Sequence, residues 1–443
     1  MSYVALVGFL MMLVIVYLLI KQKTSTMFSF AVIPIIGALL IGATPSQIGN
    51  YLTKGFAMTT SVALIMLFSL PYFMMMDDAG LFNGIVRRIL KRVKLSPVVL
   101  TVLTLVISII TGFDVSITSI YLITIPLLLP FYKKLKMSPM ILMFLTTLGV
   151  INTMDVPWSA RMLRSASLIP NIQGGAMHLF KMIFPAQIIF TVILFLVAIW
   201  LGIRESKRIK KEAEVTGETI EVGKVDVTEI KDDPEIGRPQ LFWVNVILTL
   251  LVIAGLIVFP TMPSYYVFAV GLVIALAINY PDLKQQNKLL KKYAASLFPV
   301  MPAILLSGVV VGVMEYSGMM KAMVDTLVAI IPASFGPWVY IIVAIFGVPL
   351  MFLFTNDTWY YVLLPIVISL MKAYHVPADV VIITLFFNMG AMLTPIAQPQ
   401  LYIGIDLTDG AISFEQYVKF AFFPVWILSL VLLGIGLLTG AFR

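Results

Sequence analysis

Long apolar runs separated by short polar stretches dominate the chain. A helical run of about 17–25 apolar residues is long enough to cross the hydrocarbon core of a bilayer. Most of the longer runs meet that length, and the run 27–43 is short but carries no charge. The pattern predicts ten transmembrane helices, over residues 3–20, 27–43, 60–76, 138–158, 182–203, 241–260, 264–280, 295–314, 378–398 and 419–441.

Two further apolar stretches are interrupted by polar centres. Residues 97–132 break at Thr111-Gly-Phe-Asp114, and residues 337–371 break at Thr355-Asn-Asp357. At a rise of about 1.5 Å per residue, most of the resulting arms are too short to cross a bilayer. We therefore expect two re-entrant hairpins, each entering and leaving the membrane on one side.

The pattern also repeats along the chain. Landmarks recur 238 positions apart: Gly80 and Gly318, Pro139 and Pro377, Pro157 and Pro395, Lys181 and Lys419. The recurrence predicts two repeats, residues 1–203 and 241–443, joined by a charged linker over residues 204–240. A repeat of this size in a membrane protein is typical of secondary transporters, whose substrate site lies between the halves.

Basic residues set the orientation of the predicted helices. With Lys21 and Lys23 in the cytoplasm, 23 of the 30 lysines and arginines face that side, as the positive-inside rule requires. Each repeat then has five crossings, an odd number, so the repeats are inverted relative to each other. Hairpin 97–132 opens to the cytoplasm and hairpin 337–371 to the outside, and their tips meet near the midplane. The linker is cytoplasmic and, with few apolar residues, predicted to be flexible.

Composition supports an all-α integral membrane protein. Hydrophobic residues make up 60% of the chain and charged residues 12%, with a mean hydropathy of +1.02. The chain has no cysteine, which excludes disulfides and thiolate metal sites. Its net charge of +8 is spread over short loops, so we expect membrane lipids rather than nucleic acid as its surroundings.

Polar side chains at membrane depth are the candidates for a functional site. Freed carbonyls at proline breaks suit cations, whereas helix N-termini and arginine forks suit carboxylates. We expect Asp114 and Asp357 to hold a coupling ion or metal, and Arg161 or Arg164 to be the counter-charge of an anion. Asp155 remains open between a site residue and a helix-end residue. The other substrate contacts that we predict are Ser116, Thr118, Asn152, Ser159, Asn356, Thr358, Thr394 and Gln398.

Several of these residues stand in motifs that resemble a known family. The motifs are Tyr121-Leu-Ile-Thr-Ile-Pro126, Pro157-Trp158 with Arg164 six positions later, and Asn356-Asp357-x-x-Tyr360-Tyr361-x-x-Leu364-Pro365. They resemble the citrate–metal–proton symporters of the ion transporter superfamily. The resemblance implies a homodimer with a scaffold and an elevator-type transport domain, and symport of a citrate–divalent metal complex with protons.

The chain departs from that family pattern at two places. Asp114-Val-Ser116 stands where the family has Asp-Gly-Asp, and Ser159-Ala-Arg161 stands where it has Gly-Gly-Pro. One carboxylate is lost and one arginine is gained, which moves the site towards an anion and away from a metal.

The sequence therefore predicts a symporter of citrate or of a citrate–divalent metal complex, coupled to protons or sodium. We expect no enzymatic activity and no prosthetic group, and a multi-pass location in the cell membrane of a bacterium. Alternatives are a transporter of another carboxylate, a cation/proton or oxyanion exchanger of the same superfamily, and a channel. An intramembrane aspartyl protease is disfavoured because Thr111-Gly-Phe-Asp114 lacks the Gly-x-Gly-Asp spacing of that class.

Overall fold

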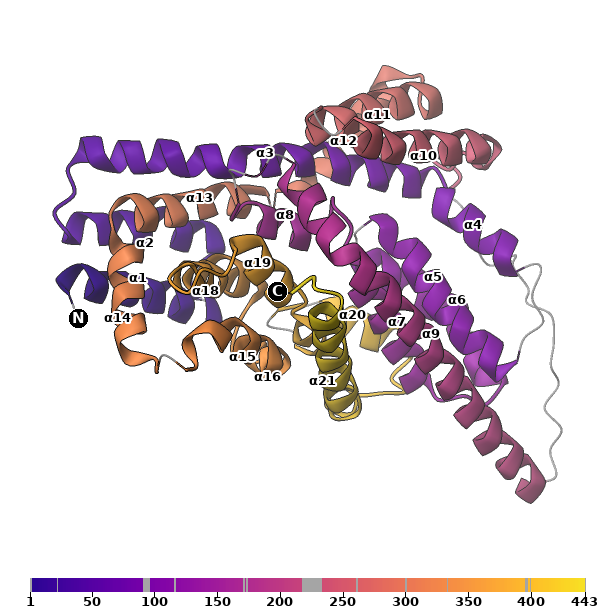
Figure 1. The fold of residues 1–443 in the computed structure, drawn as a ribbon. Coiled ribbons are helices and arrows are strands. Elements are labelled where there is room, and N and C mark those ends of the chain that lie inside the picture. Colours follow the sequence, from indigo (N-terminus) through magenta and orange to yellow (C-terminus); the bar gives the residue numbers. More distant parts are fainter. Residues whose placement is uncertain are drawn as a thin grey trace.

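The described part of the chain is built from helices. The computed structural model describes residues 2–21, 23–90, 96–114, 117–169, 172, 174–216, 233–259, 262–298, 301–332, 334–394, 397–398 and 400–442. These residues form helices and the turns between them, with no strand (Figure 1). The all-helical class predicted from the sequence is confirmed.

The described residues of the first half form nine α-helices. They are α1 Tyr3–Ile20, α2 Thr26–Leu40, α3 Pro45–Asp78, α4 Leu81–Leu90, α5 Pro97–Thr111, α6 Ile117–Lys134, α7 Pro139–Thr153, α8 Ala160–Ala166 and α9 Gly175–Thr216. A 3-10 turn, η1 Gly112–Asp114, separates α5 from α6, so the helix breaks at the predicted polar centre. The two arms pack against each other, and their re-entrant placement stays a prediction.

The second half follows a similar order. Its elements are η2 Pro239–Leu241, α10 Phe242–Val258, α11 Ser264–Asn279, α12 Leu283–Leu297, α13 Met301–Tyr316, α14 Met319–Ile330, η3 Gly336–Trp338, α15 Val339–Ile345, α16 Gly347–Leu350, α17 Asn356–Thr358, η4 Trp359–Leu363, α18 Leu364–Lys372, α19 Ala378–Phe386, η5 Met389–Leu393, α20 Gln400–Asp406 and α21 Phe414–Leu438. Helices α2 and α11 begin 238 residues apart, at positions 26 and 264, the offset seen in the sequence. The inverted relation of the halves stays a prediction.

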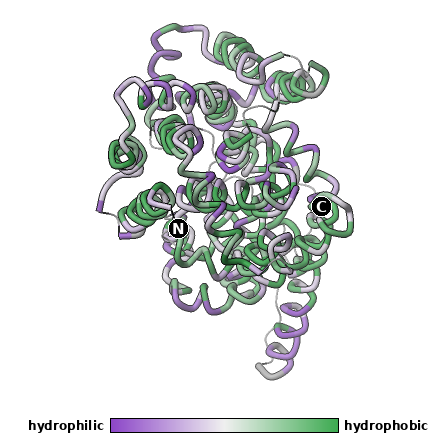
Figure 2. The backbone as a smooth tube through the Cα atoms, turned by 60° about the vertical axis from the view of Figure 1, so that its left-hand side comes forward, coloured by the Kyte–Doolittle hydropathy of each residue, from purple (hydrophilic) through white to green (hydrophobic). Residues whose placement is uncertain are grey.

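Several helices have the length and composition of membrane spans. Among the described residues, four stretches meet both criteria: Pro45–Asp78, Gly175–Glu212, Pro239–Leu256 and Phe414–Leu438. Helices α12 and α13, bent by 41°, make a fifth if they are one span, and seven shorter apolar helices accompany them. Figure 2 shows apolar residues along most helices and polar residues in the connections. The number of crossings stays a prediction.

Helix α3 is longer than the predicted span 60–76. It begins at Pro45 because Thr44 and Gln47 form a capping box, in which each side chain satisfies a free backbone group of the other. The resulting 34-residue helix runs along α13 and also contacts α11 and α12. It is therefore the main contact between the two halves (Figure 1).

Helices α3 and α13 cross at backbone distance. Gly55 of α3 meets Gly308 and Gly312 of α13, and a Cβ at any of the three would collide with the backbone of the other helix. The hydroxyl of Thr59 donates to the carbonyl of Leu305 beside this crossing, at 3.2 Å. Small residues at such crossings are typical of membrane helices, since they let backbones approach closely.

The start of the predicted linker is ordered, which differs from the flexible linker expected over 204–240. Helix α9 continues to Thr216 and projects from the body of the molecule (Figure 2). Glu205, 5% exposed, accepts from the backbone N–H of Ser138, the residue before α7, at 3.0 Å. Arg208 bonds Glu205 and the carbonyl of Lys136. These bonds hold the end of α9 against the turn before α7.

The other end of the linker is also docked. The Arg238 backbone N–H donates to the carbonyl of Ala79, and its guanidinium donates to the carbonyl of Asn279. Residues 217–232 lie outside the described residues. Both ends of the predicted linker 204–240 are thus held against the rest of the molecule.

Candidate functional site

A cavity of about 590 Å³ lies where the broken helices of both halves meet. Its wall is formed by the connection between α1 and α2, the middle of α3, the start of α6, the helix α8, the tip before η4, and the segment before α20. Six of the residues predicted from the sequence line it: Thr118, Arg161, Arg164, Asn356, Asp357 and Gln398. Residues from both hairpin regions, from the break after α7 and from the segment before α20 therefore border one cavity, and their role in binding a substrate stays a prediction.

Arg164 and Asp357 lie next to each other in the wall of this cavity. Nη2 of Arg164 lies 3.1 Å from Oδ1 of Asp357, which is close enough for an ion pair, although the groups are not aligned for a hydrogen bond. The hydroxyl of Thr26 donates to Oδ2 of Asp357 at 3.0 Å. Nε of Arg164 is buried without a partner. The guanidinium lines the cavity and the side chain is 15% exposed, so an anion in the cavity can contact it.

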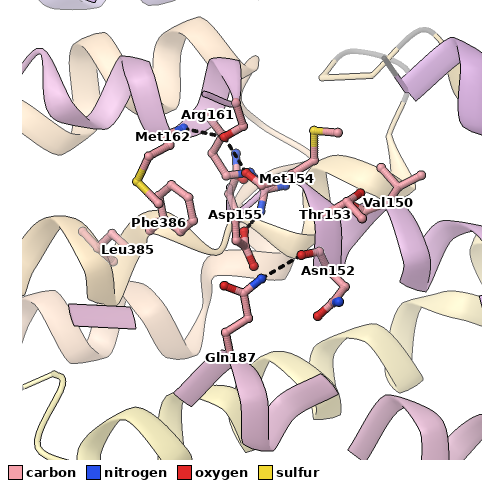
Figure 3. A network of polar contacts seen from close by, with 12 residues as sticks. Val150, Asn152, Thr153, Met154, Asp155, Arg161, Met162, Gln187, Leu385 and Phe386 are labelled. Carbon is pink, nitrogen blue, oxygen red and sulfur yellow. Dashed lines mark hydrogen bonds and ion pairs between the residues drawn. The ribbon is translucent and has the colours of Figure 1, made fainter. Parts of the chain in front are cut away.

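Arg161 forms a second ion pair behind the cavity wall. Its Nη1 lies 3.4 Å from Oδ1 of Asp155, in the break between α7 and α8 (Figure 3). The guanidinium also stands 5.6 Å from the ring centroid of Phe386. The two aspartate–arginine pairs place four ionisable side chains in and beside one cavity.

Asn356 fastens the second tip to the break before α20. Its Nδ2 donates to the carbonyl of Ala397 at 2.7 Å, and its Oδ1 accepts from Asn388 at 3.0 Å. Asn388 in turn accepts from the hydroxyl of Tyr360 at 3.1 Å. These bonds satisfy backbone groups that the broken helix leaves free, which is how irregular backbone is tolerated at membrane depth.

Four predicted contacts are buried behind the cavity: Asn152, Ser159, Thr358 and Thr394. Ser159 caps α8 by accepting from the N–H of Met162, and it donates to the carbonyl of Met154. Asn152 accepts from Thr191 and, through its carbonyl, from Gln187 of α9 (Figure 3). The N–H of Thr358 donates to the side chain of Thr355, which caps α17. At least three of the four thus hold the local backbone in place.

The predicted metal ligands are only partly described. Asp114 ends the turn η1, but the placement of its side chain lies outside what the structure describes, as does all of Ser116. Among the described residues, no group of three or more His, Asp or Glu side chains is arranged to hold a metal ion. The role of Asp114 and Asp357 as ligands stays a prediction.

Sequence reasoning missed Thr26 and left Asp155 open. The run Thr24-Ser-Thr26 is a polar stretch between two apolar helices, which usually marks a solvated loop. Nothing in that pattern shows that the loop folds onto Asp357, 331 residues away. Asp155 was one of several polar residues in a proline break, and its burial could not be read from the sequence.

The arrangement agrees with what comparison with known proteins shows. A family model described as citrate transporter matches residues 1–288. The chain belongs to the citrate transporter family. This family and the relatives below are transporters, so the protein is a transporter and not an enzyme.

Curated relatives of this transporter match it over almost its whole length. A citrate transporter of Bacillus subtilis (strain 168) is 29% identical and covers 94% of each chain. A Mg(2+)/citrate complex secondary transporter of the same organism is also 29% identical and covers 99% of this chain and 98% of its own.

Solved structures show the same fold at lower identity. The YdaH transporter of Alcanivorax borkumensis has a TM-score of 0.62 at 15% identity, covering 89% of this chain and 88% of its own. MtrF of Neisseria gonorrhoeae has a TM-score of 0.61 at 13% identity, covering 90% and 83%. These likenesses support the transporter fold.

Proposed function

We propose that this transporter is a symporter that carries citrate as a complex with a divalent metal ion, driven by protons or sodium. The observation that carries the proposal is the cavity into which the guanidinium donor of Arg164 is partly exposed, beside Asp357. A citrate carboxylate can take that donor, and the names of two relatives at 29% identity support citrate as the substrate.

The charges around the cavity favour the metal complex over free citrate. The described ionisable side chains there are Arg161, Arg164, Asp155 and Asp357, whose formal charges cancel. Fully ionised citrate would add three negative charges, whereas its complex with a divalent cation adds one. Because unbalanced charge is costly at membrane depth, the complex is the better match. The citrate itself supplies most of the metal ligands, which fits a cavity without a described metal cluster.

We infer alternating access from the parts of the chain that the cavity reaches. It reaches Thr24 and Ser25, next to Lys21, and also Ser296 of α12. The positive-inside rule assigns these regions to the cytoplasm, so the described conformation is the one open to the inside. We infer that an elevator-type movement of the two tips with α8, relative to α3 and α13, carries the site to the outside in a homodimer.

The proposal is tested by counterflow of radiolabelled citrate in proteoliposomes. We expect exchange that requires a divalent metal, is lost on chelation, and drives accumulation when a proton or sodium gradient is imposed. A competing monocarboxylate should not inhibit it. Absence of citrate exchange under every metal condition would overturn the proposal.

Free citrate or another polycarboxylate is the second candidate. The observation in its favour is that two arginines, Arg161 and Arg164, line the cavity, so that two carboxylates of a free polycarboxylate can each contact a guanidinium. Exchange that continues at full rate after chelation would select this candidate.

A further inference from the structure

The pair formed by Asp155 and Arg161 is loose for a buried ion pair. Asp155 is 1% exposed and Arg161 6% exposed, yet they share a single contact of 3.4 Å. Oδ2 of Asp155 is buried and has no hydrogen-bond partner. A buried carboxylate is normally paired and fully hydrogen-bonded, because burial of an unpaired charge is strongly unfavourable. This carboxylate therefore depends on one distant guanidinium.

The two members of the pair differ in their access to the cavity. Arg161 is part of the cavity wall, whereas Asp155 lies behind it and does not line it. Figure 3 shows Arg161 next to Asp155, in the break that follows Met154. A ligand anion in the cavity can thus contact Arg161 but not Asp155. The same guanidinium has two possible partners, one of them permanent and one supplied by the substrate.

We propose that Asp155 is the site at which substrate binding is coupled to a proton. This inference rests on the proposed function, in that the substrate is an anion. When a substrate carboxylate takes Arg161, Asp155 loses its counter-charge and binds one proton from water in the cavity, becoming a neutral carboxylic acid. When the substrate leaves, the proton leaves with it and the pair with Arg161 forms again.

The physical basis is the cost of a lone buried charge. A buried carboxylate without a partner binds a proton because its neutral form is the cheaper one. The proton gives Asp155 a hydrogen-bond donor in place of the lost ion pair. One bound proton also offsets one negative charge, which is the charge that a mono-anionic citrate–metal complex brings. Substrate and proton therefore bind together, as symport requires.

The surroundings leave Arg161 as the group that controls Asp155. Among the described residues it is the charged side chain that forms an ion pair with this carboxylate. Tyr360 of η4 donates to the carbonyl of Phe386 and to Asn388, and Arg164 is paired with Asp357. Helices α3, α9 and α19 pack on α8; Asp78 of α3 is paired with Lys292, and His178 of α9 is bonded to Asp379 of α19.

The test measures proton uptake on substrate binding directly. Purified protein in weakly buffered detergent solution, with a pH indicator, is mixed with citrate plus Mg²⁺, and bound citrate is measured in parallel. We expect wild type to take up about one proton per substrate at Asp155, as linkage requires. Asp155→Asn, which mimics the protonated state, should bind citrate without that proton. Its counterflow should persist while accumulation driven by a pH gradient is lost.

Two further variants sharpen the result. Arg161→Met should also lose the proton uptake, since Asp155 is then protonated before substrate arrives. Asp379→Asn removes an aspartate outside the cavity and should take up protons as wild type does. Wild-type proton uptake by Asp155→Asn, together with intact citrate binding, would overturn this inference alone. Failure of wild type to bind citrate in any metal condition would instead overturn the proposed function, and the inference with it.

Discussion

At the scale of single residues, the two arginines of the cavity have different environments. Arg164 lines the cavity, 15% exposed, with Asp357 beside it, so its guanidinium can gain a bond when an anion arrives. Arg161 must exchange one partner for another. Arg164 is therefore suited to binding the substrate tightly, and Arg161 to coupling substrate binding to a proton.

Replacing Arg164 by alanine is expected to weaken citrate binding. The change removes a charge-assisted hydrogen bond worth on the order of 1.5–3 kcal/mol, which is roughly a ten- to hundred-fold rise in Kd. Isothermal titration calorimetry with citrate and Mg²⁺ measures it. Lys133→Gln is the matched control, because Lys133 pairs with Asp409 on the exposed surface, where an ion pair contributes about 0–1 kcal/mol. Equal Kd values for Arg164→Ala and wild type would show that Arg164 does not contribute to citrate binding.

At the scale of elements, the breaks in the helices could be predicted from the sequence. Polar centres inside apolar runs located the breaks at Gly112 and Asn356. Polar groups are costly in hydrocarbon, so they occur there mainly where a break or a site requires them. The ends of the linker could not be predicted. Its charge balance indicated flexibility, but Glu205 and Arg208 use their charges to bond α9 to the start of α7.

Glu205→Ala is expected to lower stability without changing substrate affinity. Loss of the Glu205 carboxylate leaves the N–H of Ser138 without its charged acceptor, and a hydrogen bond to a charged group contributes about 1.5–3 kcal/mol. Thermal unfolding in detergent should show a lower Tm, while the Kd for citrate with Mg²⁺ stays at the wild-type value. Glu212→Ala, an exposed partner of the same Arg208, is the control and should change Tm little. An unchanged Tm for Glu205→Ala would show that the bond to Ser138 contributes no stability.

At the scale of the whole molecule, the inverted arrangement predicts which side of the membrane each hairpin base faces. The chain has no cysteine, so in a single-cysteine variant the introduced thiol is the only one that a maleimide can label. Lys134→Cys, at the end of the first hairpin, should react with a membrane-impermeant maleimide from the cytoplasmic side only. His375→Cys, after the second hairpin, should react from the outside only. Reaction of both from the same side would contradict the inverted repeats.

The site was less predictable than the architecture, for a physical reason. Repeat spacing, run length and lysine placement are properties of the chain itself, and they indicated which segments converge. Contacts such as Thr26 with Asp357 depend on packing between residues that are 331 positions apart. The sequence identified six residues of the cavity wall, but whether Ser159 faces a ligand or caps a helix depends on the local backbone.

The glycine crossing of α3 and α13 has a consequence for how freely this chain can vary. Most apolar positions of a membrane helix accept another apolar residue, because lipid and Leu side chains are alike in polarity. Gly55, Gly308 and Gly312 cannot, since one added methyl group would push against backbone. In a library of all single substitutions selected for transport, these three positions should retain glycine alone, whereas Gly434, with open space around it, should accept alanine.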